Sequence, residues 1–112
     1  MNTTTDPAAL DNATPACDLT AMTPSQRERH RALIGTIRAR LTEFEAAGDD
    51  LGLSFEPDPA VFVALAEWIT LERLCCPFLG FSLELEPRGG PARLRLSGGQ
   101  GALAAFRAAV GA

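Results

Sequence analysis

The sequence predicts a two-layer α+β domain in which helices pack on one face of a three-stranded, mostly antiparallel sheet. The predicted order of elements is α-β-α-β-β-α. Two observations support this fold class. Apolar residues recur at helical intervals behind two capping signals, and three shorter segments alternate apolar and polar residues. Alternation indicates strands with one buried face, so the sheet needs helices on one side only.

The first helix is predicted over residues 24–47. Thr23 is a suitable N-cap, Pro24 fits the first helical position and Gln26 completes a capping box. Gly48 would end the helix. The face that recurs at three- and four-residue steps consists of His30, Leu33, Ile34, Ile37, Leu41 and Phe44.

A strand is predicted over residues 51–56, and a second helix follows it. Asp58 provides the N-cap and Pro59 the first helical residue, while Pro77 ends the helix just after a pair of cysteines. The buried face of this helix should include Trp68. The sequence therefore predicts a helix that carries both cysteines to its C-terminal end.

The remaining residues predict a hairpin and a last helix. Residues 79–86 and 92–97 alternate apolar and polar side chains on either side of a Pro- and Gly-rich turn. On the polar face, we expect Glu84 and Glu86 to pair with Arg93 and Arg95. A helix after Gly99 would direct its apolar residues inward, namely Leu103, Phe106 and Val110.

The chain as a whole predicts one domain over residues 17–112, preceded by a flexible tail over residues 1–16, which have no apolar period. A net charge of −4 argues against nucleic-acid binding. With no signal-peptide core and no apolar run of membrane-spanning length, we expect a cytoplasmic protein that does not bind membranes. The oligomeric state is not indicated.

Two adjacent cysteines, Cys75 and Cys76, are the most unusual chemical feature of the sequence. They lie at a predicted helix C-terminus, one turn after Glu72, where the helix dipole and the carboxylate both disfavour a thiolate. This placement argues against a cysteine nucleophile. A bound cation would supply the missing positive charge, so the same placement suits a thiophilic metal ion.

We therefore predict a metal site formed by Cys75, Cys76 and the distant Cys17, with Glu72 as an oxygen ligand or as a group that orients the sulfurs. The ion would be of the Hg, Cu, As or Zn class, and the sequence favours sequestration or sensing over catalysis. His30 could complete a Cys₃His zinc site. For His30 we prefer the interpretation of a capped or partly exposed helix histidine.

Two alternatives remain open. The protein could be a thiol–disulfide redox protein that cycles a Cys75–Cys76 or a Cys17–Cys76 disulfide. It could also be a non-catalytic interaction domain, because buried cysteines commonly act as small apolar residues.

The string Glu72-Arg73-x-Cys75-Cys76-Pro77-Phe78, with the upstream Cys17, resembles a group of small, largely uncharacterised bacterial proteins. Some members of that group are associated with heavy-metal resistance, including mercury resistance. The resemblance covers about residues 17 to 108. It implies that Cys17, Glu72, Cys75 and Cys76 are the functional positions.

Overall fold

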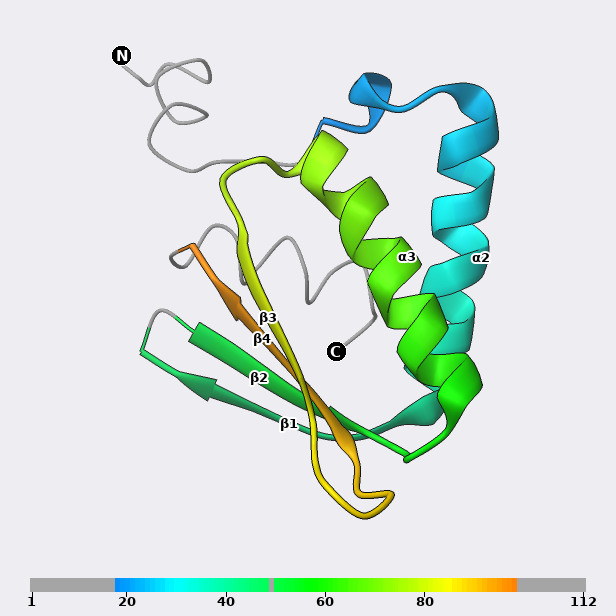
Figure 1. Ribbon diagram of the computed structural model, residues 1–112. Coiled ribbons are helices and arrows are strands. Elements are labelled where there is room, and N and C mark those ends of the chain that lie inside the picture. The colour runs from blue at the N-terminus through cyan, green and yellow to red at the C-terminus, as the bar shows by residue number, and fades with distance from the viewer. Residues whose placement is uncertain (1–17, 49, 99–112) are drawn as a thin grey trace.

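The computed structural model describes residues 18–48 and 50–98 (Figure 1). This part of the chain forms two long helices and a four-stranded antiparallel sheet. A 3-10 turn, η1 (Leu19–Ala21), precedes the helices α2 (Pro24–Arg40) and α3 (Pro59–Cys75). The strands are β1 (Leu41–Ala47), β2 (Asp50–Phe55), β3 (Gly80–Leu85) and β4 (Ala92–Ser97), and their spatial order is β1-β2-β4-β3.

The predicted strand count and element order are wrong. The helix expected over residues 24–47 ends at Arg40, and the residues after it form β1. The order of elements is consequently α-β-β-α-β-β, with four strands. The predicted last helix lies outside the described residues.

A β-bulge explains why β1 has the sequence pattern of a helix. Leu41 pairs with Phe55 and Phe44 pairs with Leu53, but the register shifts between Leu41 and Glu43. The extra residue places Leu41 and Phe44 on the same face of the sheet, although an odd number of steps separates them. A three-residue interval between apolar side chains is also the signature of a helix.

The predicted starts of both helices and the stop before Pro77 are confirmed, whereas the stop predicted at Gly48 is wrong. Thr23 and Gln26 form a capping box, in which each side chain accepts the backbone N–H of the other residue. Asp58 caps α3 by accepting the N–H of Ala60, and α3 ends two residues before Pro77. The predicted hairpin is present as β3 and β4, with Glu84 opposite Arg93.

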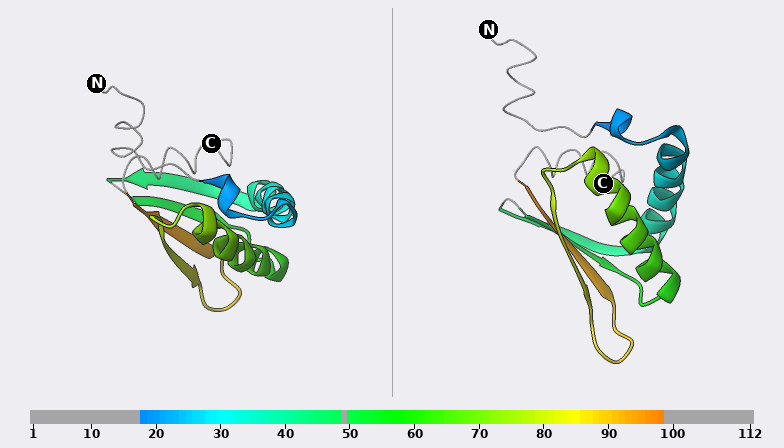
Figure 2. Two further views of the ribbon diagram at one scale, coloured as in Figure 1. Left: turned by 90° about the horizontal axis from the view of Figure 1, so that it is seen from above. Right: turned by 45° about the horizontal axis from the view of Figure 1, so that its top comes forward.

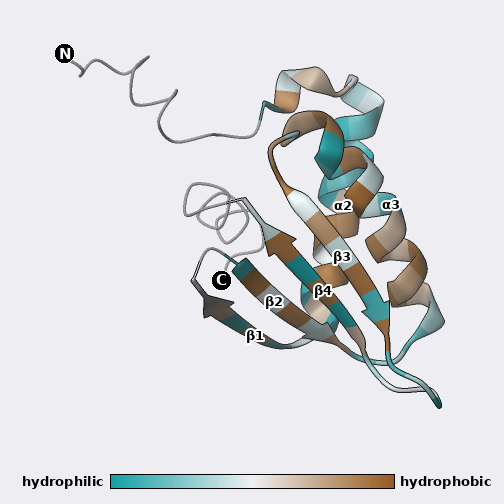
Figure 3. Ribbon diagram, turned by 60° about the vertical axis from the view of Figure 1, so that its left-hand side comes forward, coloured by the Kyte–Doolittle hydropathy of each residue, from teal (hydrophilic) through white to brown (hydrophobic). Residues whose placement is uncertain are grey.

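Both helices cover the same face of the sheet. The inward side chains of β2 and β4 form one cluster with those of α2 and α3, and Figure 2 shows the two helices side by side. Along the strands, hydrophobic and hydrophilic residues alternate, as Figure 3 shows. Neither described helix combines the length and the apolar character that crossing a membrane requires.

Candidate metal centre

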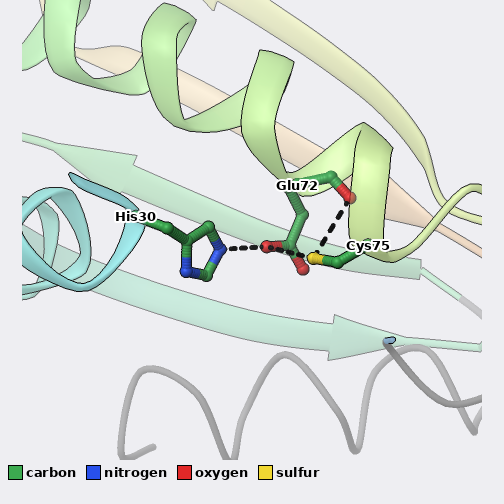
Figure 4. Close-up of side chains that lie close together, drawn as sticks. All are labelled: His30, Glu72 and Cys75. Atoms are coloured by element: carbon green, nitrogen blue, oxygen red, sulfur yellow. Dashed lines mark hydrogen bonds and ion pairs between the residues drawn. The ribbon is translucent and has the colours of Figure 1, made fainter. Parts of the chain in front are cut away.

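Two polar residues lie within the core of the described part of the chain. His30 is 7% exposed and Glu72 is 2% exposed. Nε2 of His30 lies 2.6 Å from Oε1 of Glu72, so the imidazole and the carboxylate share a short hydrogen bond (Figure 4). An ionised carboxylate can only accept, so with Glu72 ionised the Nε2–H of His30 is the donor. The bond joins the two helices across the core.

Helical periodicity brings these groups to the interface between α2 and α3. The buried residues of α2 are His30, Leu33 and Ile37, which recur at three- and four-residue steps. On α3, Glu72 follows Trp68 by one turn and precedes Cys75 by three residues, so it lies within an otherwise apolar stripe. A carboxylate on such a stripe must enter the core and find polar partners there.

The sulfur atoms of Cys75 and Cys76 both lie next to the carboxylate of Glu72. Sγ of Cys75 lies 3.8 Å from Oε1 of Glu72, and Sγ of Cys76 lies 3.1 Å from Oε2. The two sulfurs are 3.7 Å apart and both side chains are buried. His30, Glu72 and Cys75 have ligand atoms within 4.8 Å of one another, a group that could hold a metal ion.

The two cysteines differ in oxidation state. Cys75 is a free thiol, whereas Cys76 is disulfide-bonded. The bond is not to its neighbour, because the sulfur atoms of Cys75 and Cys76 are 3.7 Å apart. The sulfur partner of Cys76 therefore lies outside the described residues.

The core strongly disfavours a thiolate at Cys75. Burial, followed by the charge of Glu72, raises the pKa of the Cys75 thiol to about 12. The Cys75 thiol also donates to the backbone oxygen of Glu72 at 3.6 Å. Without a bound cation, Cys75 is therefore a protonated and weakly nucleophilic thiol.

This pKa predicts an unusual pH dependence of alkylation. In a Cys17→Ser/Cys76→Ser variant, the rate at which iodoacetamide modifies Cys75 should rise about 100-fold from pH 7.5 to 9.5, because the thiolate population grows tenfold per pH unit well below the pKa. The same variant unfolded in guanidinium chloride should instead level off near pH 9. A folded-state rate that also levels off near pH 9 would contradict the raised pKa.

The chain just before α2 is anchored at the C-terminal end of α3. Asp18 donates its backbone N–H to the carbonyl oxygen of Cys75 at 2.7 Å. The guanidinium of Arg27 donates to the carbonyl oxygen of Met22 at 2.9 Å, and the Met22 side chain is buried. These contacts hold η1 against α3, next to the cysteine pair.

The structure brings three of the four predicted ligands together, namely Glu72, Cys75 and Cys76. The fourth, Cys17, lies outside the described residues. The preferred interpretation of His30 as a partly exposed histidine is wrong, because the side chain is buried against Glu72. The burial of His30 could have been predicted from its position on the apolar face of its helix.

A surface hollow of about 530 Å³ lies elsewhere, on the face of the sheet opposite the helices. Its lining includes alternating charged side chains from three strands: Glu43, Glu45, Glu84, Arg93 and Arg95. Several of these pair with other residues, such as Arg93 with Glu86 and Arg95 with Asp50. Its lining includes none of His30, Glu72, Cys75 and Cys76, so we place the candidate site inside the core.

Comparisons with known proteins assign neither a family nor a function to the chain. No protein-family model matches the chain, and no curated protein or solved structure matches it significantly. The resemblance carried by residues 72–78 consequently stays a prediction. Any functional proposal depends on the geometry of the buried cluster.

Proposed function

We propose that the protein binds a thiophilic metal ion, of the Hg, Cu, As or Zn class, and serves to sequester or sense it. The observation that carries this proposal is the convergence of His30, Glu72 and Cys75 within 4.8 Å inside the core, with the sulfur of Cys76 beside them. The reduced protein would use Cys75 and Cys76 as sulfur ligands, supported by Glu72 and His30.

The separation of the two sulfurs supports this ligand set. Two thiolates on one tetrahedral ion, each with a bond of about 2.3 Å, lie about 3.8 Å apart. Sγ of Cys75 and Sγ of Cys76 are 3.7 Å apart, and both face the carboxylate of Glu72. Little rearrangement of these two side chains would be needed.

The hydrogen bond between His30 and Glu72 supports the same proposal, because a metal ion could replace its proton. A metal ion takes the place of such a proton when a neutral imidazole and a carboxylate act as ligands. Imidazole and carboxylate favour borderline ions such as Zn(II), whereas thiolates favour soft ions such as Cu(I). The mixed set therefore fits zinc at least as well as the softer ions.

Chain connectivity supports Cys17 as a further thiolate ligand. Cys17 is covalently bonded to Asp18, and the backbone N–H of Asp18 donates to the carbonyl oxygen of Cys75. The resemblance to proteins associated with mercury resistance points to the same residues.

The test is native mass spectrometry of the reduced protein titrated with Hg(II), Cu(I), As(III) and Zn(II). The wild type should retain one ion of at least one of these elements, and a Cys75→Ser/Cys76→Ser variant should lose it. A Glu67→Gln variant is the matched control, since Glu67 lies on the same helix in an exposed ion pair with Arg29. Equal retention by wild type and the cysteine variant would end the proposal.

A second candidate function is thiol–disulfide exchange, and one observation favours it. Cys76 is disulfide-bonded and a free thiol, Cys75, lies 3.7 Å from its sulfur. Against this stands the pKa of about 12 at Cys75, which leaves almost no thiolate to attack a disulfide. A protein that catalyses reduction of a model disulfide at neutral pH, and retains none of the four ions, would favour this second function.

A further inference from the structure

We propose that the disulfide of Cys76 gates ion binding: the oxidised site binds a zinc-class ion weakly, and reduction completes the site. This inference rests on the proposed function, because it concerns the regulation of the same site. It joins two observations that the proposed function leaves separate, namely the buried cluster and the oxidised sulfur within it.

Because Cys76 lies within the buried site, its oxidation state determines how many thiolates the site can offer to a metal ion. Its side chain is 0% exposed, and its sulfur lies 3.7 Å from Sγ of Cys75 and 3.1 Å from Oε2 of Glu72. Only the thiolate form of cysteine is a strong metal ligand, and a disulfide sulfur carries neither a proton to lose nor a negative charge. In the oxidised protein, the described part of the site therefore offers one thiolate, from Cys75.

Opening the gate is a two-electron reduction by a thiol reductant, either a small thiol or a protein dithiol. A thiolate of the reductant attacks the disulfide and forms a mixed disulfide, and a second thiol of the reductant then displaces the protein sulfur. The two reductant sulfurs end as a disulfide. Cys76 and its former partner end as two thiols, and their two protons come from the two thiols of the reductant.

Reduction changes the chemistry of the site more than its shape. Cys76 is the C-cap of α3, and its backbone N–H donates to the carbonyl oxygen of Glu72 at 2.7 Å. This bond belongs to the helix and does not depend on the disulfide. The reduced sulfur should thus stay beside Cys75 and add a second thiolate to the set of His30, Glu72 and Cys75.

Thermodynamic linkage gives the gate a second property. If reduction strengthens ion binding, a bound ion must stabilise the reduced form by the same factor. The zinc-loaded protein should consequently resist disulfide formation by a mild oxidant.

The experiment compares zinc affinity in the two redox states of the full chain. The reduced protein is prepared with a phosphine that is then removed under argon, and the oxidised protein with a mild thiol oxidant. Maleimide labelling after unfolding, assigned to residues by peptide mass, should find Cys75 labelled in both states and Cys76 labelled only after reduction. Zinc affinity is measured by competition with a chromophoric chelator.

We expect the reduced protein to bind one Zn(II) about 100-fold more tightly or better, since losing groups that only support ligands already weakens affinity about 10- to 100-fold. A Cys76→Ser variant should bind weakly with or without prior reduction, and Cys76→Ala repeats the test if the serine variant does not fold. Equal affinity in both wild-type states would overturn the gate but not ion binding. No zinc in either state, together with no Hg(II), Cu(I) or As(III), would overturn both proposals.

Discussion

Replacing Glu72 with glutamine is expected to weaken zinc binding by the reduced protein about 10- to 100-fold, even though the side chain keeps its size. The amide removes the negative charge that lies between His30 and the two sulfurs. It also presents an NH₂ group, which donates hydrogen bonds and does not bind a cation. Affinity is measured by chelator competition on the reduced, folded variant.

The same substitution should change the stability of the ion-free protein. His30 and Glu72 are both buried, and their 2.6 Å hydrogen bond links the two helices. Weakening a charge-assisted bond inside the core typically costs about 1–3 kcal/mol. The free energy of unfolding, obtained from urea denaturation under reducing conditions, should fall by about this amount.

Glu67→Gln is the matched control for Glu72→Gln, because both positions lie on α3. Glu67 pairs with Arg29 at 2.7 Å, but both side chains are largely exposed. Solvent screens such a pair, so neither zinc affinity nor the urea midpoint should change appreciably. If Glu72→Gln binds zinc as the wild type does, Glu72 is neither a ligand nor a group that supports the ligands.

The sequence was sufficient to predict those elements whose ends are determined by local capping or turn residues. The capping box at Thr23 and the Asp58-Pro59 start are local, so they act wherever the helix packs. The β3–β4 hairpin was equally predictable from alternation and its turn. The bulged strand β1 was not, since its apolar spacing is that of a helix and its pairing with β2 fixes its conformation.

The site residues also divide into those that local sequence predicts and one that only the packing of the two helices brings in. Glu72, Cys75 and Cys76 lie within about one helical turn, so their proximity follows from helix geometry alone. His30 is 42 residues from Glu72 in the chain and reaches it only because α2 packs against α3. No spacing rule links two such positions. A disulfide at Cys76 was one of the two alternatives, and no residue pattern favours it over metal binding.

Trp68 should have the largest effect on stability among the side chains beside the site. It is 1% exposed, its ring lies edge-on to Phe81 with centroids 5.9 Å apart, and its centroid is 6.3 Å from that of His30. Truncating a buried tryptophan to alanine typically costs about 3–5 kcal/mol, because contacts are lost and a cavity remains. Domains of this size have only about 5–15 kcal/mol of stability in total.

Trp68→Ala is therefore expected to lower the urea midpoint severely, and Trp68→Phe to lower it less, since a ring is retained against His30 and Phe81. Leu74→Ala is the control on the same helix. Leu74 is 44% exposed, so its truncation should change the free energy of unfolding by only about 0.5 kcal/mol. A Trp68→Ala midpoint equal to that of Leu74→Ala would contradict this packing.

The tryptophan variants also separate the positioning of His30 from the presence of the ligands. Trp68 bears no ligand atom of the proposed site, yet its ring is a neighbour of the imidazole. With the ring removed, His30 gains space to leave Glu72, so zinc should bind more weakly to folded Trp68→Ala than to Trp68→Phe. If both variants bind zinc with wild-type affinity while folded, the site would depend on Glu72 and the thiolates and not on a fixed His30.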